Sequence, residues 1–335
     1  MTLLDPSFAG LLRTLVTAPV SRLFDPAEQT WWPTYAGALV LAVCAYLWQR
    51  RGRKSGLRGL GRFLWPATLL KRPSVRLDVK LYLFNSAALL LQGLWLVGGD
   101  AMSDRLVTLL HLGAHPRPLG PVALFLVPIG LYLAIELGYW LSHFMLHRLP
   151  WLWEFHKVHH SAEVLTPLAE LRQHPVESLL VGLVCGTAYA LALTGLKAVF
   201  GPHLDLLAFW RPGVILFLVF ATYMHLRHSH VRLGAPAWLS HIIQTPLQHQ
   251  VHHSTDPRHF DRNLGFCLSV FDWAFGTLYV PTGDERLDFG VHDDDGAPDE
   301  LMASTRLVDH LWRPFARAFG RSAPTAGETP AVPAE

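Results

Sequence analysis

The sequence has few charged residues and few cysteines. Only 16% of its 335 residues are charged, whereas 51% are hydrophobic and 12 are tryptophan, a composition typical of membrane proteins. The formal net charge of +2 indicates little about partners, and we expect no nucleic-acid partner. Cys44, Cys185 and Cys267 lie far apart and form no C-x-x-C pair, so we expect neither a disulfide framework nor cysteine metal ligands.

The two ends of the chain lack the features of a packed core. Residues 1–30 have no basic start and no long apolar run, so we predict an N-terminal lead without a cleaved signal peptide. Within it, residues 11–24 fit either an amphipathic surface segment or a disordered one. Residues 321–335 are rich in Ala, Pro, Thr and Glu and predict a disordered tail. The remaining residues, 31–320, are predicted to form one domain.

Histidine, in contrast, is abundant, with 19 in the chain. Ten of them occur in four groups just beyond strongly apolar stretches. The groups are His143 and His147; His156, His159 and His160; His225 and His228; and His249, His252 and His253.

The spacing within these groups indicates a metal site. On a helix, His143 and His147 are one turn apart and point from the same face. In the string H-x-x-H-H, the two adjacent histidines diverge by about 100° and can serve two different ions. This string occurs twice, at residues 156–160 and again at residues 249–253, so we infer two metal ions.

The number of histidines exceeds what a single ion needs. One zinc site is saturated by about four ligands, and imidazole also suits iron, copper and nickel. His174 and His230 lie near the groups in sequence and add to the supply. The isolated histidines are expected to be ordinary core or surface residues: His111, His115, His203, His241, His259, His292 and His310.

Apolar runs predict an all-α integral membrane protein with about four to five transmembrane helices. The candidate spans are residues 34–48, 81–97, 119–140, 178–200 and 204–224. Residues 49–79 between the first two contain nine Lys and Arg, which predicts a cytosolic loop. Counting spans from that loop places both histidine regions on the same, cytosolic side. We therefore predict a cytosolic, histidine-lined cap that holds two metal ions.

From Glu136 to Thr277 the sequence resembles the fatty acid hydroxylase and sterol desaturase superfamily, which are membrane di-iron oxygenases. The likeness rests on a series of motifs with a core at 126–280: HFMLH at 143–147, LWEFHKVHHS at 152–161, RQHPVE at 172–177, HSHV at 228–231, TPLQHQVHHS at 245–254, DRNLG at 261–265 and FDWAFGT at 271–277. Relatives often have Arg where this chain has Phe144 and Asn where it has His230.

The resemblance implies two non-haem irons with histidine ligands. It assigns His143, His147, His156, His159, His160, His228, His249, His252 and His253, and adds His174 and His225, although some relatives lack the former. We predict that His230 lies outside the ligand set, because on a helix it points about 200° away from His228. Glu136, Asp261 and Asp272 are the candidate acids that accept the outer ring protons of ligating histidines.

The implied activity is O2-dependent hydroxylation or desaturation of a C–H bond in a membrane lipid. No haem, flavin or nicotinamide fingerprint is present, and Gly56, Gly59 and Gly61 have the wrong spacing for one, so a separate protein must supply electrons. Its candidate docking residues are Lys157, Arg172, Arg227 and Arg232. Alternatives are a metal transporter or buffer and a zinc hydrolase. Because arginine outnumbers lysine, we expect a bacterial inner-membrane protein.

Overall fold

The computed structural model describes residues 17–24, 31–50, 56–88, 93–114, 117–202, 204, 223–293 and 296–320. Within these ranges the chain is helical and has no strand, only three isolated bridges. The prediction of a mainly helical protein is thereby confirmed. The predicted N-terminal lead is described only at 17–24, and the predicted tail lies outside the described residues.

Helices of very different length make up the fold. The longer ones are α2 (Trp32–Gln49), α3 (Leu57–Leu64), α5 (Pro73–Ala88), α6 (Gly93–Leu109), α7 (Pro121–Arg148), α8 (Pro150–His160), α9 (Pro175–Phe200) and α15 (Leu307–Gly320). The shorter ones are α4 (Ala67–Leu70), α11 (Ala237–Ser240), α12 (Pro246–His252), α13 (Val270–Phe275), α14 (Glu300–Ala303), η1 (Arg22–Phe24), η3 (Ala169–Leu171) and η5 (Pro257–His259).

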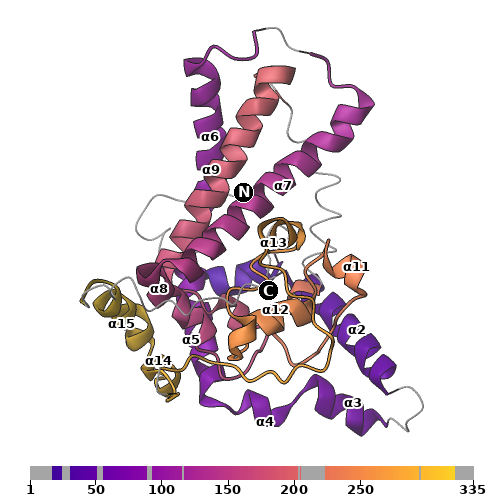
Figure 1. The fold of residues 1–335 in the computed structure, drawn as a ribbon, viewed down its shortest axis with the longest axis vertical. Coiled ribbons are helices and arrows are strands. Elements are labelled where there is room, and N and C mark those ends of the chain that lie inside the picture. The colour runs from indigo at the N-terminus through magenta and orange to yellow at the C-terminus, as the bar shows by residue number, and fades with distance from the viewer. Residues whose placement is uncertain are drawn as a thin grey trace.

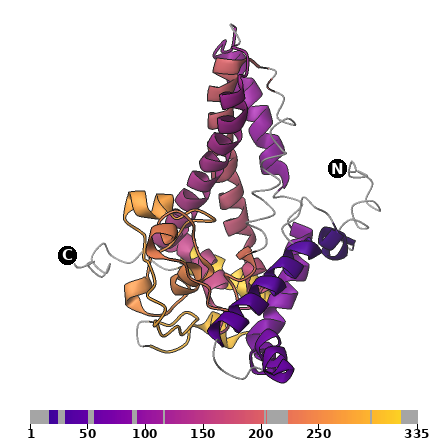
Figure 2. The ribbon, with the colours of Figure 1, turned by 90° about the vertical axis from the view of Figure 1, so that its right-hand side faces the viewer.

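Three helices project from a broader base. Figures 1 and 2 show α6, α7 and α9 packed together as a stalk, with the other elements around its lower end. Close backbone approach between α7 and α9 requires a glycine, because a Cβ on Gly138 would lie 2.8 Å from the Cα of Cys185. Val127 and Leu131 of α7 are buried against Leu193 of α9. The last turn of α7 and the first turn of α9 both reach the base.

The predicted spans agree with this arrangement only in part. Two of them, 119–140 and 178–200, lie in α7 and α9, which among the described residues are the helices long and apolar enough to cross a membrane. The predicted span 81–97 covers the end of α5 and the start of α6, and residues 89–92 between them lie outside the described residues. The span 34–48 lies in α2, and the span 204–224 falls almost wholly outside the described residues.

The base is held together by apolar contacts between segments distant in sequence. Leu77 and Leu81 of α5 pack against Val158 of α8 and Leu301 of α14. Three alanines of α2, Ala38, Ala42 and Ala45, pack against Leu226 and Val231. The first of these clusters includes α8, the short helix that contains the first H-x-x-H-H string.

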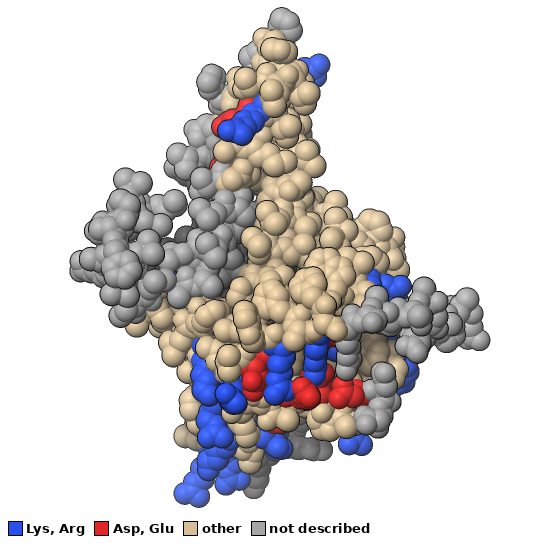
Figure 3. All heavy atoms as spheres, turned by 90° about the vertical axis from the view of Figure 1, so that its left-hand side faces the viewer, with Lys and Arg blue, Asp and Glu red and all other residues tan. Residues whose placement is uncertain are grey.

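Charged side chains are confined to the two ends of the molecule on the face shown in Figure 3. They form a band across the base and a small group near the tip of the stalk, and the surface between is almost free of them. At the tip, Lys197 of α9 forms an ion pair with Asp104 of α6 at 2.6 Å. On this face, the distribution leaves a wide uncharged zone along the stalk.

Candidate metal centre

Local sequence explains how the histidine helices begin and end. Pro150 ends α7 after His147 and is the first residue of α8, where a missing backbone N–H costs nothing. α12 begins with a capping box in which Thr245 accepts from the N–H of Gln248 and Gln248 accepts from that of Thr245. Both helices present their histidines to the same space below α7.

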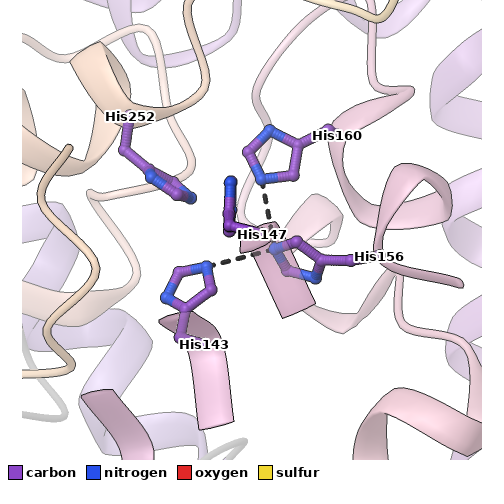
Figure 4. A group of neighbouring side chains, drawn as sticks. All are labelled: His143, His147, His156, His160 and His252. Atoms are coloured by element: carbon purple, nitrogen blue, oxygen red, sulfur yellow. Dashed lines mark hydrogen bonds between the residues drawn. The ribbon is translucent and has the colours of Figure 1, made fainter. Parts of the chain in front are cut away.

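Five histidines make the first group. His143 and His147 come from α7, His156 and His160 from α8, and His252 from α12, and their ligand nitrogens all lie within 4.8 Å of one another. Figure 4 shows the five rings converging on a common space. The Nε2 atom of His156 is 3.1 Å from that of His143 and 3.2 Å from that of His160.

Four histidines make the second group: His159 of α8, His228, and His249 and His253 of the second H-x-x-H-H string. The Nε2 atom of His228 is 3.2 Å from that of His159, 3.0 Å from that of His253 and 3.1 Å from that of His249. Adjacent histidines therefore separate as their divergence on a helix predicts: His160 and His252 serve one group, and His159 and His253 the other.

Backbone carbonyls hold the outer nitrogens of three of these rings. The Nδ1 atoms lie 2.8 Å from the carbonyl of Leu264 for His143, 3.1 Å from that of Arg172 for His159, and 2.8 Å from that of Arg262 for His252. A carbonyl only accepts, so each Nδ1 donates a proton. In the neutral ring Nε2 then has a free lone pair directed into the cluster.

Acidic side chains lie beside two more rings. His156 Nδ1 is 3.1 Å from the carboxylate of Glu177, and His147 Nδ1 is 3.4 Å from that of Asp261. Outer acids of this kind fix the tautomer of a ligating histidine and raise its basicity. Glu177 lies in the first turn of α9, where the helix dipole also favours a negative charge.

These residues fit bound metal ions. His143 and His252 both donate through Nδ1 to backbone carbonyls, so in the neutral rings both Nε2 atoms offer lone pairs to the first group. The Nε2 atom of His156 lies 3.1 Å from that of His143. A separation near 3 Å is what two nitrogens about 2 Å from a shared ion would have. In addition, Nε2 of both His147 and His252 are buried without a hydrogen-bond partner.

Burial favours the neutral form of most of these rings, which is the form that binds a metal. Burial lowers the pKa of His159 to about 3. Burial also lowers the pKa of His160, His228, His249 and His253 well below the usual value, and neighbouring groups lower it further. A buried cluster of uncharged imidazoles can take up cations without first losing protons.

A strained loop supplies two of the carbonyl acceptors. Asp261 and Asn263 have left-handed φ angles of 57° and 56°, which Asp and Asn tolerate better than most residues. They flank Arg262, whose carbonyl accepts from His252. Leu264 follows Asn263, and its carbonyl accepts from His143. Gly265 is required here, because a Cβ would meet the carbonyl oxygen of Leu268 at 2.3 Å.

Only one of the three predicted acids contacts a histidine. That one is Asp261, which also pairs with Arg148 at 2.8 Å. Asp272 instead accepts from the backbone N–H groups of Leu264 and Gly265, at 2.8 and 2.9 Å, and so acts on His143 through the loop. Glu136 accepts from the backbone N–H groups of Cys267 and Leu268 and from the Tyr132 hydroxyl.

Three histidines that the sequence analysis considered as possible ligands lie outside both groups. His174 is the N-cap of α9: its Nδ1 accepts from Val176 N–H at 3.1 Å and its Nε2 donates to the Leu311 carbonyl. His225 has Nε2 at 2.7 Å from the Thr34 hydroxyl and Nδ1 at 3.4 Å from Glu170. His230 contacts the Phe63 carbonyl through Nε2 at 2.7 Å. The structure thus does not bring His174 and His225 to the predicted metals.

Sequence reasoning missed several contributors. Glu177 could have been found, because helical side chains tilt toward the helix N-terminus and Glu177 lies in the first turn of α9. The carbonyl acceptors, in contrast, have no sequence signal. Arg172 and Arg227, predicted to lie on a docking surface, are only 1% and 2% exposed and cannot form one. Arg172 instead forms a buried ion pair with Asp78 of α5 at 2.6 Å.

Comparison with known proteins agrees with this geometry. Residues 129–277 match the family model described as fatty acid hydroxylase, a range that contains all nine clustered histidines.

Similar proteins include alkylglycerol monooxygenase of Danio rerio, 27% identical over 57% of this chain and 39% of the relative. The human alkylglycerol monooxygenase is 29% identical over 55% of this chain and 37% of the relative. The ornithine lipid hydroxylase of Rhizobium tropici is 28% identical over 50% of this chain and 46% of the relative. The match thus spans less than half of each of these relatives, and no solved structure matches significantly.

Proposed function

The chain belongs to the fatty acid hydroxylase superfamily, and from this membership we propose that it is a membrane-bound, O2-dependent lipid hydroxylase with two non-haem irons. The observation that carries the proposal is the division of nine histidines, eight of them buried, into two groups. A single zinc site needs about four ligands, so the hydrolase alternative leaves the second group without a role.

The histidines would hold one ion in each group, and such ions supply O2 activation when bound. The protein's own part is to keep the rings neutral, to fix their tautomers through the outer carbonyls and carboxylates, and to exclude water by burial. His147 and Asp261 form the most exposed of these outer contacts, with Asp261 34% exposed.

Hydroxylation is favoured over desaturation by the relatives. Their names denote a monooxygenase that acts on alkylglycerol and a hydroxylase that acts on ornithine lipid. The overall reaction converts a C–H bond and O2 into C–OH and water, and it consumes two electrons and two protons. We propose that a separate electron-transfer protein supplies the electrons, as the sequence lacks a cofactor fingerprint of its own.

A membrane setting is supported by α7 and α9, which are long and apolar enough to cross a bilayer. The basic residues of α3, together with Lys71 and Arg72 just after α4, lie in the base, at the histidine end of the stalk. By the positive-inside rule we propose that the histidine centre faces the cytosol. This orientation fits a bacterial inner-membrane enzyme that modifies lipid C–H bonds at the membrane.

Metal analysis combined with lipid mass spectrometry tests the proposal. The purified chain should contain about two irons, and membranes of cells that express it should contain a lipid with one added oxygen atom. His252→Ala and His159→Ala each remove one ligand, from different groups, and both should lower iron content and abolish the product.

His111→Ala is the matched control. His111 lies just beyond α6 at the tip of the stalk, opposite the histidine centre, so iron and product should be unchanged. One zinc per chain in the wild type would contradict the oxygenase proposal, as would full activity of His252→Ala with normal iron content.

A further inference from the structure

One face of α15 exposes large apolar side chains. Val308, Trp312, Phe315 and Phe319 are 51%, 71%, 36% and 70% exposed. Their spacing of four, three and four residues places them on a single helix face. A soluble surface rarely exposes so many large apolar groups together, so this face has the character of a contact surface.

The apolar face is fixed in its outward direction. Arg317 and Arg313, on the other side of α15, form ion pairs with Asp299 and Glu300. His310 and Pro314 are buried against the base. Rotation of α15 that covered the apolar face would break these ion pairs and expose both buried residues.

A second exposed apolar patch lies on the other side of the stalk. Trp238 of α11 and Ile242 just after it are 68% and 46% exposed, and Trp273 and Phe275 of α13 are 64% and 57% exposed. Phe275 stacks on Trp140 of α7 with ring centroids 4.4 Å apart. The patch therefore packs against α7. Figure 1 shows α13 and α15 on opposite sides of α7.

The surface around the two apolar patches identifies a lipid bilayer as the partner that covers them. Above the charged band of the base, Figure 3 shows an uncharged surface that continues along the stalk. Leu133, Leu137 and Leu141 of α7 are each exposed on that stalk. Tryptophan is enriched where a bilayer meets water, because its ring is apolar and its N–H is polar.

We propose that the exposed side chains of α11, α13 and α15 form an aromatic collar that inserts between the lipid headgroups and acyl chains at the base of the stalk. The proposal rests on the membrane setting proposed above. Phe315 of α15 packs on Phe155 of α8, with ring centroids 5.0 Å apart. The collar thereby couples membrane depth to α8, which contains three of the clustered histidines.

Site-specific labelling tests the collar on the full chain. In a Cys44→Ala background, where the remaining cysteines are buried, a polarity-sensitive fluorophore is attached to Trp312→Cys on the apolar face. The control label is on Arg306→Cys, which precedes α15 and is exposed to water. A reference label on Leu126→Cys reports the outer surface of α7, where Leu126 is 54% exposed.

The labelled proteins are placed in phosphatidylcholine vesicles with brominated acyl chains, and iodide is the aqueous quencher. The collar predicts that bromine quenches the labels at 312 and 126 several-fold more than the label at 306, and that iodide does the reverse. Labelling should leave the iron content unchanged, because none of the three positions contacts a histidine of either group.

Other outcomes separate the possible failures. If iodide reaches 312 as readily as 306 while 126 is quenched by bromine, the collar is overturned and the membrane setting stands. If iodide reaches 126 as well, both are overturned. If neither quencher reaches 312 and the labels quench each other, a second copy of the chain covers α15, and the collar is again overturned. Loss of iron or product bears on the proposed function alone.

Discussion

At the scale of single residues, the two histidines of the string HSHV have different surroundings. His228 lies in the second group with its Nε2 close to three other ring nitrogens, whereas His230 lies outside both groups and contacts the carbonyl and the ring of Phe63. We predict that His228→Asn loses iron and turnover, while His230→Asn keeps iron and most activity. Iron analysis of the two purified variants is the measurement, and equal losses would show that His230 is a ligand.

The residue contacts also make Asp272 more important than Asp261. Asp272 is buried and accepts from Leu264 N–H, Gly265 N–H, the Trp140 ring and the Thr277 hydroxyl. Asp261 is 34% exposed and 3.4 Å from its histidine. We predict that Asp272→Asn lowers iron affinity by roughly 10- to 100-fold, and Asp261→Asn by less. Iron titration of the two apoproteins measures the order, which the opposite ranking would contradict.

At the scale of elements, the loop at 261–265 sets the direction of two ligand rings. Gly265→Ala must displace this loop, because the new Cβ would lie 2.3 Å from the Leu268 carbonyl oxygen. We predict a loss of iron without loss of the membrane-inserted helices. Gly130→Ala in α7 is the control, since a Cβ there meets nothing within 4 Å and helix propensity improves. Iron content and circular dichroism are compared, and unchanged iron in Gly265→Ala would contradict the loop's role.

The contact between α5 and the segment after α8 includes a buried ion pair. Arg172 and Asp78 are 1% and 0% exposed, so Asp78→Ala leaves a buried guanidinium without its partner. We expect a loss of about 3–5 kcal/mol in the free energy of unfolding, measured with denaturant in detergent.

The doubly substituted variant Asp78→Leu with Arg172→Met tests whether this pair acts on stability alone. It should recover much of the loss, because apolar groups of similar volume often replace a buried pair without cost. It should also retain iron, because His159 donates to the backbone carbonyl of residue 172 and not to its side chain. A stable double variant without iron would show that the side chains themselves position His159.

At the scale of the whole molecule, the structure separates the histidine centre from the tip of the stalk, and we propose that the membrane lies between them. The histidine centre and α15 lie at the base, and the end of α6 lies at the tip. We predict that a reporter fused after Arg321 is cytosolic and that a tag inserted at Gly113 is accessible only from outside the cell. Protease protection of the tag in spheroplasts measures this, and finding both on one side would contradict the topology.

The sequence by itself determined the helical class, the two long apolar helices and the division of the ligands. This is because helical periodicity is local: residues three or four apart share a face, and adjacent residues diverge, so His159 and His160 can serve different groups. The spacing within the repeated H-x-x-H-H string was enough to predict two groups of histidines.

Only the tertiary structure decided which polar groups surround the ligands. His174 and His225 look like ligands in sequence, but one caps α9 and the other contacts Thr34. Conversely, the carbonyls of Arg172, Arg262 and Leu264 hold three rings, and every residue type has a carbonyl. Such contacts depend on backbone directions in loops that long-range packing fixes, and for that reason no local pattern could have predicted them.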